Sequence, residues 1–249
     1  KIIEAAKYCK NDLCSEIVFE FPELQGIMGG KYLKYEGFSE DVCLAVAEHY
    51  LPSFYKDALP STKYGAIVSI ADKVETLISI FISGKRPSGS SDPYALRRNL
   101  NGVIKIIWDY ELDLPLDKLF NELIDFWKIA FPNLNFSREK VFNDLNEFLV
   151  QRIVSHLEDI SVSKELIKAI CSSDELSQKR VLNIVDLKNR INCIINFNEK
   201  DNFVEIQKVI TRVSKLANKS DISRDVLSSR DCVNTKLFEK DCEFKVFEF

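Results

Sequence analysis

Apolar side chains recur at helical spacing along almost the whole chain, and this periodicity constrains the fold more than any other feature. Residues 66–82 and 93–109 both place apolar side chains three and four positions apart, with polar side chains between them. The alternation of apolar and polar residues that is typical of half-buried strands is scarce. The sequence therefore predicts an all-α fold in which each helix buries one face.

The helix predicted at residues 93–109 has a clear start signal. Asp92 can accept hydrogen bonds from the free N–H groups of the first turn, and Pro93 has the backbone angle of a first helical residue. Residues 84–91, which precede the helix, are rich in Gly, Ser and Pro, so they are predicted to form a loop.

A break in the helical pattern at residues 131–135 divides the chain. After it, Ser137 can cap a helix that begins at Arg138. We therefore predict a helical domain over residues 1–135 and a helical bundle over residues 136–249. In the second domain the periodicity predicts helices at residues 163–171, 177–197 and 202–218. The apolar side chains expected to be buried in the last of these belong to Phe203, Ile206, Val209, Ile210, Val213 and Leu216.

Composition excludes several classes of protein. The chain has 34 Lys and Arg residues against 38 Asp and Glu residues, so any nucleic-acid binding must come from local basic patches. The 7 cysteines are odd in number and never arranged as Cys-x-x-Cys, which favours free thiols over a disulfide framework or a zinc site. No uninterrupted apolar stretch reaches the length of about 18 residues that a membrane span needs. We therefore expect a soluble cytoplasmic protein without a membrane partner.

Only two histidines occur, His49 and His156, which leaves few catalytic or metal-binding arrangements. His49, followed by Asp72 in an apolar helix, resembles the later half of a helical metal-dependent phosphohydrolase site of the HD type. Such a site also needs an adjacent His-Asp pair and another upstream histidine, because a hard divalent ion requires several fixed nitrogen and oxygen ligands. Those residues are missing, so we predict no metal and interpret His49 and Asp72 as vestigial positions.

No other motif indicates catalysis. The glycines of residues 26–30 do not form Gly-x-Gly-x-x-Gly, and no βαβ pattern surrounds them. Gly84 and Lys85 lack the upstream glycine of a phosphate-binding loop. Neither a Gly-x-Ser-x-Gly motif nor a readable pairing of Cys with His indicates a covalent nucleophile. We therefore predict no catalytic residue in this chain.

Two of the predicted helices carry rows of basic side chains. Arg97, Arg98 and Lys105 lie on the polar side of the helix predicted at residues 93–109. The second repeats the pattern over residues 202–219, where Glu205 is the only acidic residue. Its basic residues, at positions i, i+4, i+7 and i+11, are Lys208, Arg212, Lys215 and Lys219. Such rows attract phosphates, although a solvated helix face can carry the same pattern.

A succession of motifs within residues 11–108 resembles a known family. Its most specific parts are Glu-Phe-Pro-Glu-Leu-Gln-Gly-Ile-Met-Gly at 20–29 and Gly-Ser-Ser-Asp-Pro-Tyr-Ala-Leu-Arg-Arg at 89–98, in this order. Between them lie Glu-His-Tyr-Leu-Pro at 48–52 and Ala-Asp-Lys-Val-Glu-Thr-Leu at 71–77. The succession resembles the central region of the β subunit of the two-subunit, bacterial-type glycyl-tRNA synthetase.

The resemblance implies an HD-like helical domain over residues 1–135, followed by part of a helical anticodon-binding domain over residues 136–249. The second match is weaker, since Thr-Arg-Val-Ser-Lys at 211–215 stands where the family shows Lys-Arg-Val-x-Asn-Ile. No base contact is therefore assigned to a single side chain there. The family's other modules are not in this sequence, which agrees with ends that look like cuts within a longer polypeptide.

The resemblance also implies a function. The enzyme joins glycine to its tRNA through an adenylate, with ATP and Mg²⁺ held by a partner α subunit in a hetero-oligomer, so this chain is expected to carry no cofactor. Its expected role is to position tRNA(Gly) through phosphate contacts from basic side chains. The candidates are Arg97, Arg98, Lys105, Lys208, Arg212, Lys215 and Lys219. Two alternatives stay open, an active HD-type phosphohydrolase and a helical scaffold that only docks the partner subunit.

Overall fold

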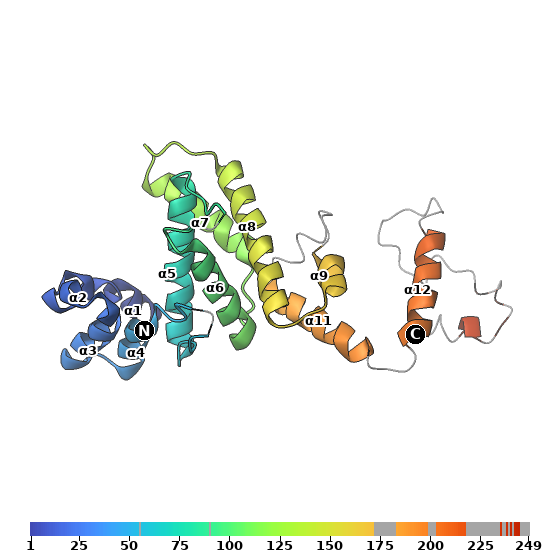
Figure 1. The fold of residues 1–249 in the computed structure, drawn as a ribbon, viewed down its shortest axis with the longest axis horizontal. Helices are drawn as coiled ribbons and strands as arrows, with labels where there is room; N and C mark the ends of the chain where they lie inside the picture. The colour runs from blue at the N-terminus through green and yellow to red at the C-terminus, as the bar shows by residue number, and fades with distance from the viewer. Residues whose placement is uncertain are drawn as a thin grey trace. The chain divides into compact units, whose positions relative to one another are not determined.

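The computed structural model describes residues 1–54, 56–89, 91–171, 183–198 and 203–217, together with residues 235, 238, 240 and 242–244. These residues form helices joined by turns and loops (Figure 1), with one isolated bridge between Ser88 and Ser91 and no strand among them. The prediction of an all-α fold is therefore confirmed for the described part of the chain. The chain divides into two compact units, Lys1–Ile194 and Ile195–Phe249.

Short helices and 3-10 turns open the first unit, and most of the later helices are longer. The short elements are α1 (Ile2–Tyr8), the 3-10 turn η1 (Asn11–Cys14), α2 (Glu16–Glu20), the 3-10 turn η2 (Pro22–Leu24), α3 (Ile27–Tyr35) and α4 (Glu40–Glu48). The later ones are α5 (Lys63–Ile82), α6 (Leu96–Tyr110), α7 (Leu116–Ala130), α8 (Arg138–Asp159), α9 (Lys164–Ile170) and α11 (Ile184–Asn198). The second unit contains α12 (Phe203–Ala217). Part of α11 lies on each side of the division between the units.

Helix α5 is the central helix of the first unit, between the α1–α4 group and α6–α8 (Figure 1). It packs against α1 and α4 with one part of its surface and against α6, α7 and α8 with another. Its apolar residues Val74, Leu77 and Ile78 are fully buried in the larger core, as the periodicity predicted. A helix that is buried on several sides holds its side chains in fixed positions. The polar residues at the border of the buried surface of α5 are therefore held in place as well.

The start of α6 differs from the prediction. The Asp92 carboxylate does accept hydrogen bonds from the backbone N–H groups of Leu96 and Arg97, both at 2.9 Å, so its capping role is confirmed. The helix begins only at Leu96, however, because the backbone first turns between Asp92 and Ala95, whose φ of 56° is left-handed. Pro93 is therefore not the first helical residue.

The start of α8 agrees with the prediction. Ser137 Oγ accepts a hydrogen bond from the backbone N–H of Lys140 at 3.3 Å, and the helix begins at Arg138. The domain boundary predicted between residues 135 and 136 falls in the turn between α7 and α8, which pack against each other inside the first unit. That boundary stays a prediction.

Helix α12 forms where it was predicted, but its apolar face is not buried among the described residues. Val209, Ile210 and Val213 are each 60% exposed and Leu216 is 69% exposed, while Ile206 is partly buried. The prediction of a buried face is wrong for those four side chains, because periodicity identifies an apolar face without supplying a surface to cover it. The side chain of Phe203 and residues 177–182 of the predicted preceding helix lie outside the described residues.

Candidate nucleic-acid interface

His49, the first of the two predicted vestigial positions, lies directly after α4 and is completely buried. Its two ring nitrogens contact the backbone oxygen of Val46 at 2.6 Å and the ammonium nitrogen of Lys10 at 2.9 Å. An ammonium group can only donate, so Nε2 accepts from Lys10 and the Nδ1 N–H donates to Val46. Burial, followed by the charge of Lys10, lowers the pKa of His49 to about 4, which keeps the ring neutral at physiological pH.

Lys10 joins the two vestigial positions. Its Nζ forms an ion pair with Asp72 Oδ1 at 2.8 Å while donating to His49, and it lies 3.9 Å from the centre of the Tyr50 ring. The ammonium thus lies between the imidazole and the carboxylate, where a metal ion bound by these two groups would lie. No group of three or more His, Cys, Asp or Glu side chains that could hold a metal occurs among the described residues.

Lys73 fixes the connection between α4 and α5. It is buried, and its Nζ donates to the backbone oxygens of Tyr50 at 2.9 Å, Leu51 at 3.3 Å and His49 at 3.4 Å, and to Ser69 Oγ at 3.0 Å. Burial lowers the pKa of Lys73 to about 8, so the side chain is still mostly protonated at neutral pH. These bonds hold the backbone that leads from His49 into the loop before α5.

A polar hollow of about 330 Å³ lies beside this cluster. Three cationic side chains line it, Lys10, Lys73 and Arg98, against the single carboxylate of Asp72, and the other lining side chains are uncharged. Three positive charges facing one negative charge favour an anionic ligand such as a phosphate.

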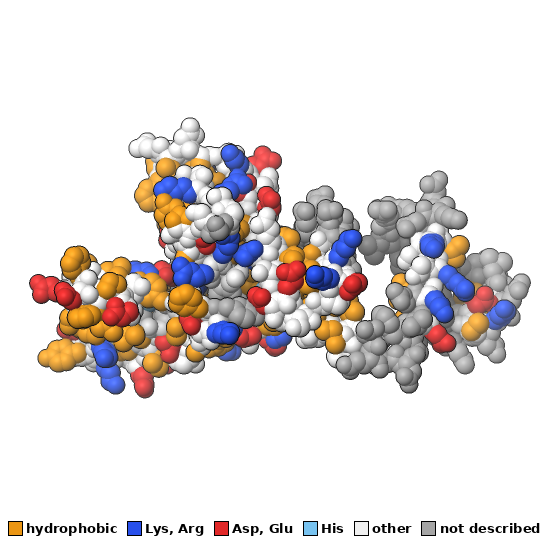
Figure 2. Space-filling model, in the orientation of Figure 1, with side chains coloured by type: hydrophobic (Ala, Val, Ile, Leu, Met, Phe, Trp, Pro, Cys, Tyr) orange, Lys and Arg blue, Asp and Glu red, His pale blue; other side chains and the backbone are white. Residues whose placement is uncertain are grey.

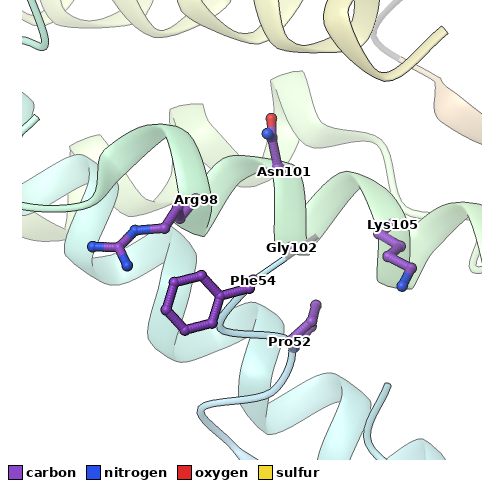
Figure 3. Close-up of a pocket in the computed structure, with 6 residues that line it drawn as sticks. All are labelled: Pro52, Phe54, Arg98, Asn101, Gly102 and Lys105. Atoms are coloured by element: carbon purple, nitrogen blue, oxygen red, sulfur yellow. The ribbon is translucent and has the colours of Figure 1, made fainter. Parts of the chain in front are cut away.

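A smaller hollow of about 100 Å³ adjoins α6 (Figure 3). It is lined by Pro52, Phe54, Arg98, Asn101, Gly102 and Lys105. Figure 3 shows Phe54 and Pro52 on the same side of α6 as Arg98 and Lys105, whereas the Asn101 amide points away from the ring. Arg98 lines both hollows, so the two share this residue.

The structure separates the three predicted residues of α6. The Arg97 guanidinium donates to the backbone oxygen of Gly89 at 2.8 Å, so this side chain is directed to the loop before the helix. Lys105 donates to the backbone oxygen of Asp57 at 3.1 Å and lines the smaller hollow together with Arg98. Arg98 and Lys105 therefore belong to one site, and Arg97 does not line either hollow.

The basic row of α12 is exposed along the described part of that helix. Lys208, Arg212 and Lys215 all have exposed side chains, while Lys219 lies outside the described residues. Figure 2 shows Lys and Arg side chains, in blue, over α12. Glu205 is the only acidic residue between Phe203 and Ala217. The row is thus available to a phosphate backbone, although these contacts stay predictions.

Three residues of the site, Lys10, Phe54 and Lys73, were not among the candidates predicted from the sequence. Lys73 had a signal, because it is the one charged residue on the buried stripe of α5, between Ile70 and Val74. Lys10 and Phe54 had none, since nothing in their local patterns indicates that the first would reach Asp72 or that the second would lie over a hollow.

The sequence of this chain is similar to those of known proteins. Residues 1–172 match the sequence model of a family described as "Glycyl-tRNA synthetase beta subunit". The chain is similar to the glycine–tRNA ligase beta subunit of Acaryochloris marina, with 37% identity over 245 residues that cover 98% of this chain and 34% of that protein. It is also similar to the proteins of the same name from Trichodesmium erythraeum (35% over 249 residues, 99% and 34%) and Clostridioides difficile (34% over 245 residues, 98% and 33%). The chain thus spans about a third of the length of these relatives.

Among the described residues, none of the helices combines the length and the apolar character needed to cross a membrane.

Proposed function

This chain belongs to the glycyl-tRNA synthetase β-subunit family, and from that premise we propose that it positions tRNA(Gly) for attachment of glycine at the active site of a partner α subunit. In this proposal ATP and Mg²⁺ bind to the α subunit within a hetero-oligomer, and the present chain supplies no catalytic residue. The observation that supports it best is the exposed row Lys208, Arg212 and Lys215 on a chain whose formal net charge is −4. A cationic helix face on an acidic chain is a local electrostatic footprint for phosphates.

The α6 side of the first unit supports the same proposal. Arg98 and Lys105 are held close to the loop that contains Phe54, so they meet a ligand in a fixed arrangement. Phosphate contacts from such side chains set the register of an RNA without reading its sequence. The α12 row would add contacts of the same kind from a second compact unit.

The experiment that tests the proposal is a filter-binding titration of tRNA(Gly) against the full chain across a range of salt concentrations. Replacing Lys208, Arg212 and Lys215 together with Ala should weaken binding and reduce the slope of log affinity against log salt by about 2 to 3. The matched control replaces three exposed lysines of the first unit, Lys7, Lys31 and Lys34, and changes the net charge equally. Equal losses in both variants, or none in the first, would contradict the role of α12.

One observation favours a second candidate function. The exposed apolar residues Val209, Ile210 and Val213 are typical of a surface that docks another polypeptide, as a scaffold for the partner subunit would need. A pure scaffold predicts copurification with the α subunit and no measurable affinity of this chain for tRNA.

The phosphohydrolase alternative is disfavoured by the ammonium of Lys10 between His49 and Asp72. Hydrolysis of a phosphodiester by the chain in the presence of manganese would support this alternative again.

A further inference from the structure

The first observation that the proposed function leaves unexplained is the exposure of Phe54. This ring is 59% exposed although it lies on a backbone that is firmly held. The backbone N–H groups of Ser53 and Phe54 donate to Asp57 Oδ2 at 3.0 and 2.7 Å, and Ser69 Oγ donates to the backbone oxygen of Leu51 at 2.5 Å. A single exposed aromatic residue is ordinary, but one fixed in place beside a hollow is a preformed contact surface.

The second observation is the pairing of the ring with a cation. The Arg98 guanidinium carbon lies 5.2 Å from the centre of the Phe54 ring, within the distance for a cation–π contact. Arg98 also lines the polar hollow with Lys10 and Lys73. An aromatic face, a planar cation and an anion-favouring hollow are therefore adjacent to one another.

The third observation is a difference in the lining of the two hollows, since the smaller one has an apolar wall in addition to Arg98, Asn101 and Lys105. The smaller one has Pro52, the Phe54 ring and the backbone of Gly102 in its wall, where a Cβ on Gly102 would lie 3.3 Å from the backbone oxygen of Pro52 and 3.0 Å from Lys73 Cε. The larger one contains three cations and one carboxylate. A nucleotide likewise combines a planar aromatic base, whose face can stack on a ring, with an anionic phosphate.

We propose that the two hollows together hold one unstacked nucleotide of the bound RNA, with its base against Phe54 and its phosphate beside Arg98 and Lys10. This inference rests on the proposed function, because it identifies a place where the tRNA is held. Sequence-tolerant binding of single-stranded RNA combines a basic groove with aromatic rings on which bases stack, and both elements are present here. Asn101 has no role in it, since its amide points away from the ring.

The test measures fluorescence anisotropy of a labelled single-stranded RNA pentamer with the full chain, and compares it with the same pentamer made of abasic nucleotides. Phe54→Ala should weaken binding of the normal pentamer about 5- to 100-fold, as loss of one stacked base does. It should leave the salt dependence and the affinity for the abasic pentamer unchanged. Phe54→Trp should restore binding, because it keeps an aromatic face.

The matched controls separate stacking from charge and from general damage. Phe19→Ala removes a phenylalanine that is 86% exposed on α2, and it should leave RNA affinity unchanged. Arg98→Ala should weaken both pentamers and reduce the salt slope by about 0.7, as loss of one phosphate contact to a single strand does. Arg98→Lys should recover that slope.

The outcomes distinguish this inference from the proposed function. If tRNA(Gly) binds but Phe54→Ala has the same affinity as the unmodified chain, the nucleotide site is refuted and the wider function stands. If no RNA binds to the unmodified chain, both are refuted. If a polyglutamate peptide competes as well as the RNA, the hollows form a general anion surface, which also overturns the inference.

Discussion

Helices α6 and α12 have the same length of 15 residues and are both amphipathic with basic residues on their polar side, yet their apolar faces differ in burial among the described residues. In α6 the apolar residues Leu100, Val103 and Ile107 are fully buried in the core of the first unit. In α12 the corresponding residues, such as Val213 and Leu216, are mostly exposed. An amphipathic pattern therefore establishes that a helix forms and which face is apolar, whereas burial depends on what the rest of the fold brings to that face.

The basic side chains of the two helices differ in the same way. Arg97 and Lys105 of α6 donate hydrogen bonds to backbone oxygens of neighbouring loops, and Arg98 lies over an aromatic ring. Lys208 and Lys215 of α12 are exposed. If both helices bind RNA, α6 contributes contacts whose geometry is set in advance, and α12 contributes attraction that depends mainly on charge.

The largest expected effect concerns burial. Leu100→Ala in α6 should lower the free energy of unfolding by about 2 to 5 kcal/mol, because it leaves a cavity in a packed core. Leu216→Ala in α12 should change it by less than about 0.5 kcal/mol, as substitutions of exposed residues do. Urea denaturation followed by circular dichroism measures both. A comparable loss in the second variant would show that the apolar face of α12 is covered in solution, and the comparison would fail.

The next effect concerns pH, because both histidines belong to the first unit and α12 has none. Burial lowers the pKa of His49 to about 4, against about 6.5 in an unfolded chain, so the unfolded state binds the proton first as the pH falls. The stability contributed by the neutral ring is complete above pH 6.5 and declines towards pH 4, by up to about 3 kcal/mol. His156, next to Trp108 of α6, acts in the same direction because burial lowers its pKa as well.

Urea denaturation at a series of pH values between 7 and 4 checks this expectation. The variant His49→Gln should show a flatter dependence, since its amide does not titrate in this range. An unchanged dependence in that variant would place the acid sensitivity elsewhere. The helical signal of α12 should not follow the titration of either histidine.

The smallest expected effect concerns Lys105 of α6, whose side chain is hydrogen-bonded to a neighbouring loop. Lys105→Met removes the hydrogen bond to the backbone oxygen of Asp57 while keeping most of the apolar stem, and it should cost about 1 kcal/mol of stability. Lys208→Met in α12 is the matched change at an exposed position and should have no measurable cost. The same denaturation experiment measures both variants. Equal values would mean that the basic side chains of α6 are no better fixed than those of α12.

The sequence predicted what depends on local pattern. Helical periodicity located α5, α8 and α12, and the side chains of Ser137 and Asp92 cap helices as expected. The beginning of α6 was missed because Ala95 adopts a left-handed conformation that the Asp-Pro signal does not reveal. Local rules work where the interacting atoms are a few residues apart.

The candidate site depended on contacts between distant residues, so most of it could not be predicted. His49 and Asp72 were predicted as vestigial ligand positions, but the residue that joins them, Lys10, lies in the turn between α1 and η1 and has no distinguishing pattern. The role proposed for Phe54 depends on the hollow that this residue lines, which the sequence does not reveal. The basic candidates Arg98 and Lys105 were named from the sequence, whereas their separation from Arg97 required the structure.

The ammonium of Lys10 has a consequence for how the molecule depends on its surroundings. The fraction of a binding site that a metal ion occupies depends on the concentration of the ion and on its affinity, so a chelator or a shortage of the metal empties the site. A cation attached to the backbone cannot diffuse away, and its local supply is constant. The contact that Lys10 makes between His49 and Asp72 of α5 is therefore formed by atoms of the chain itself.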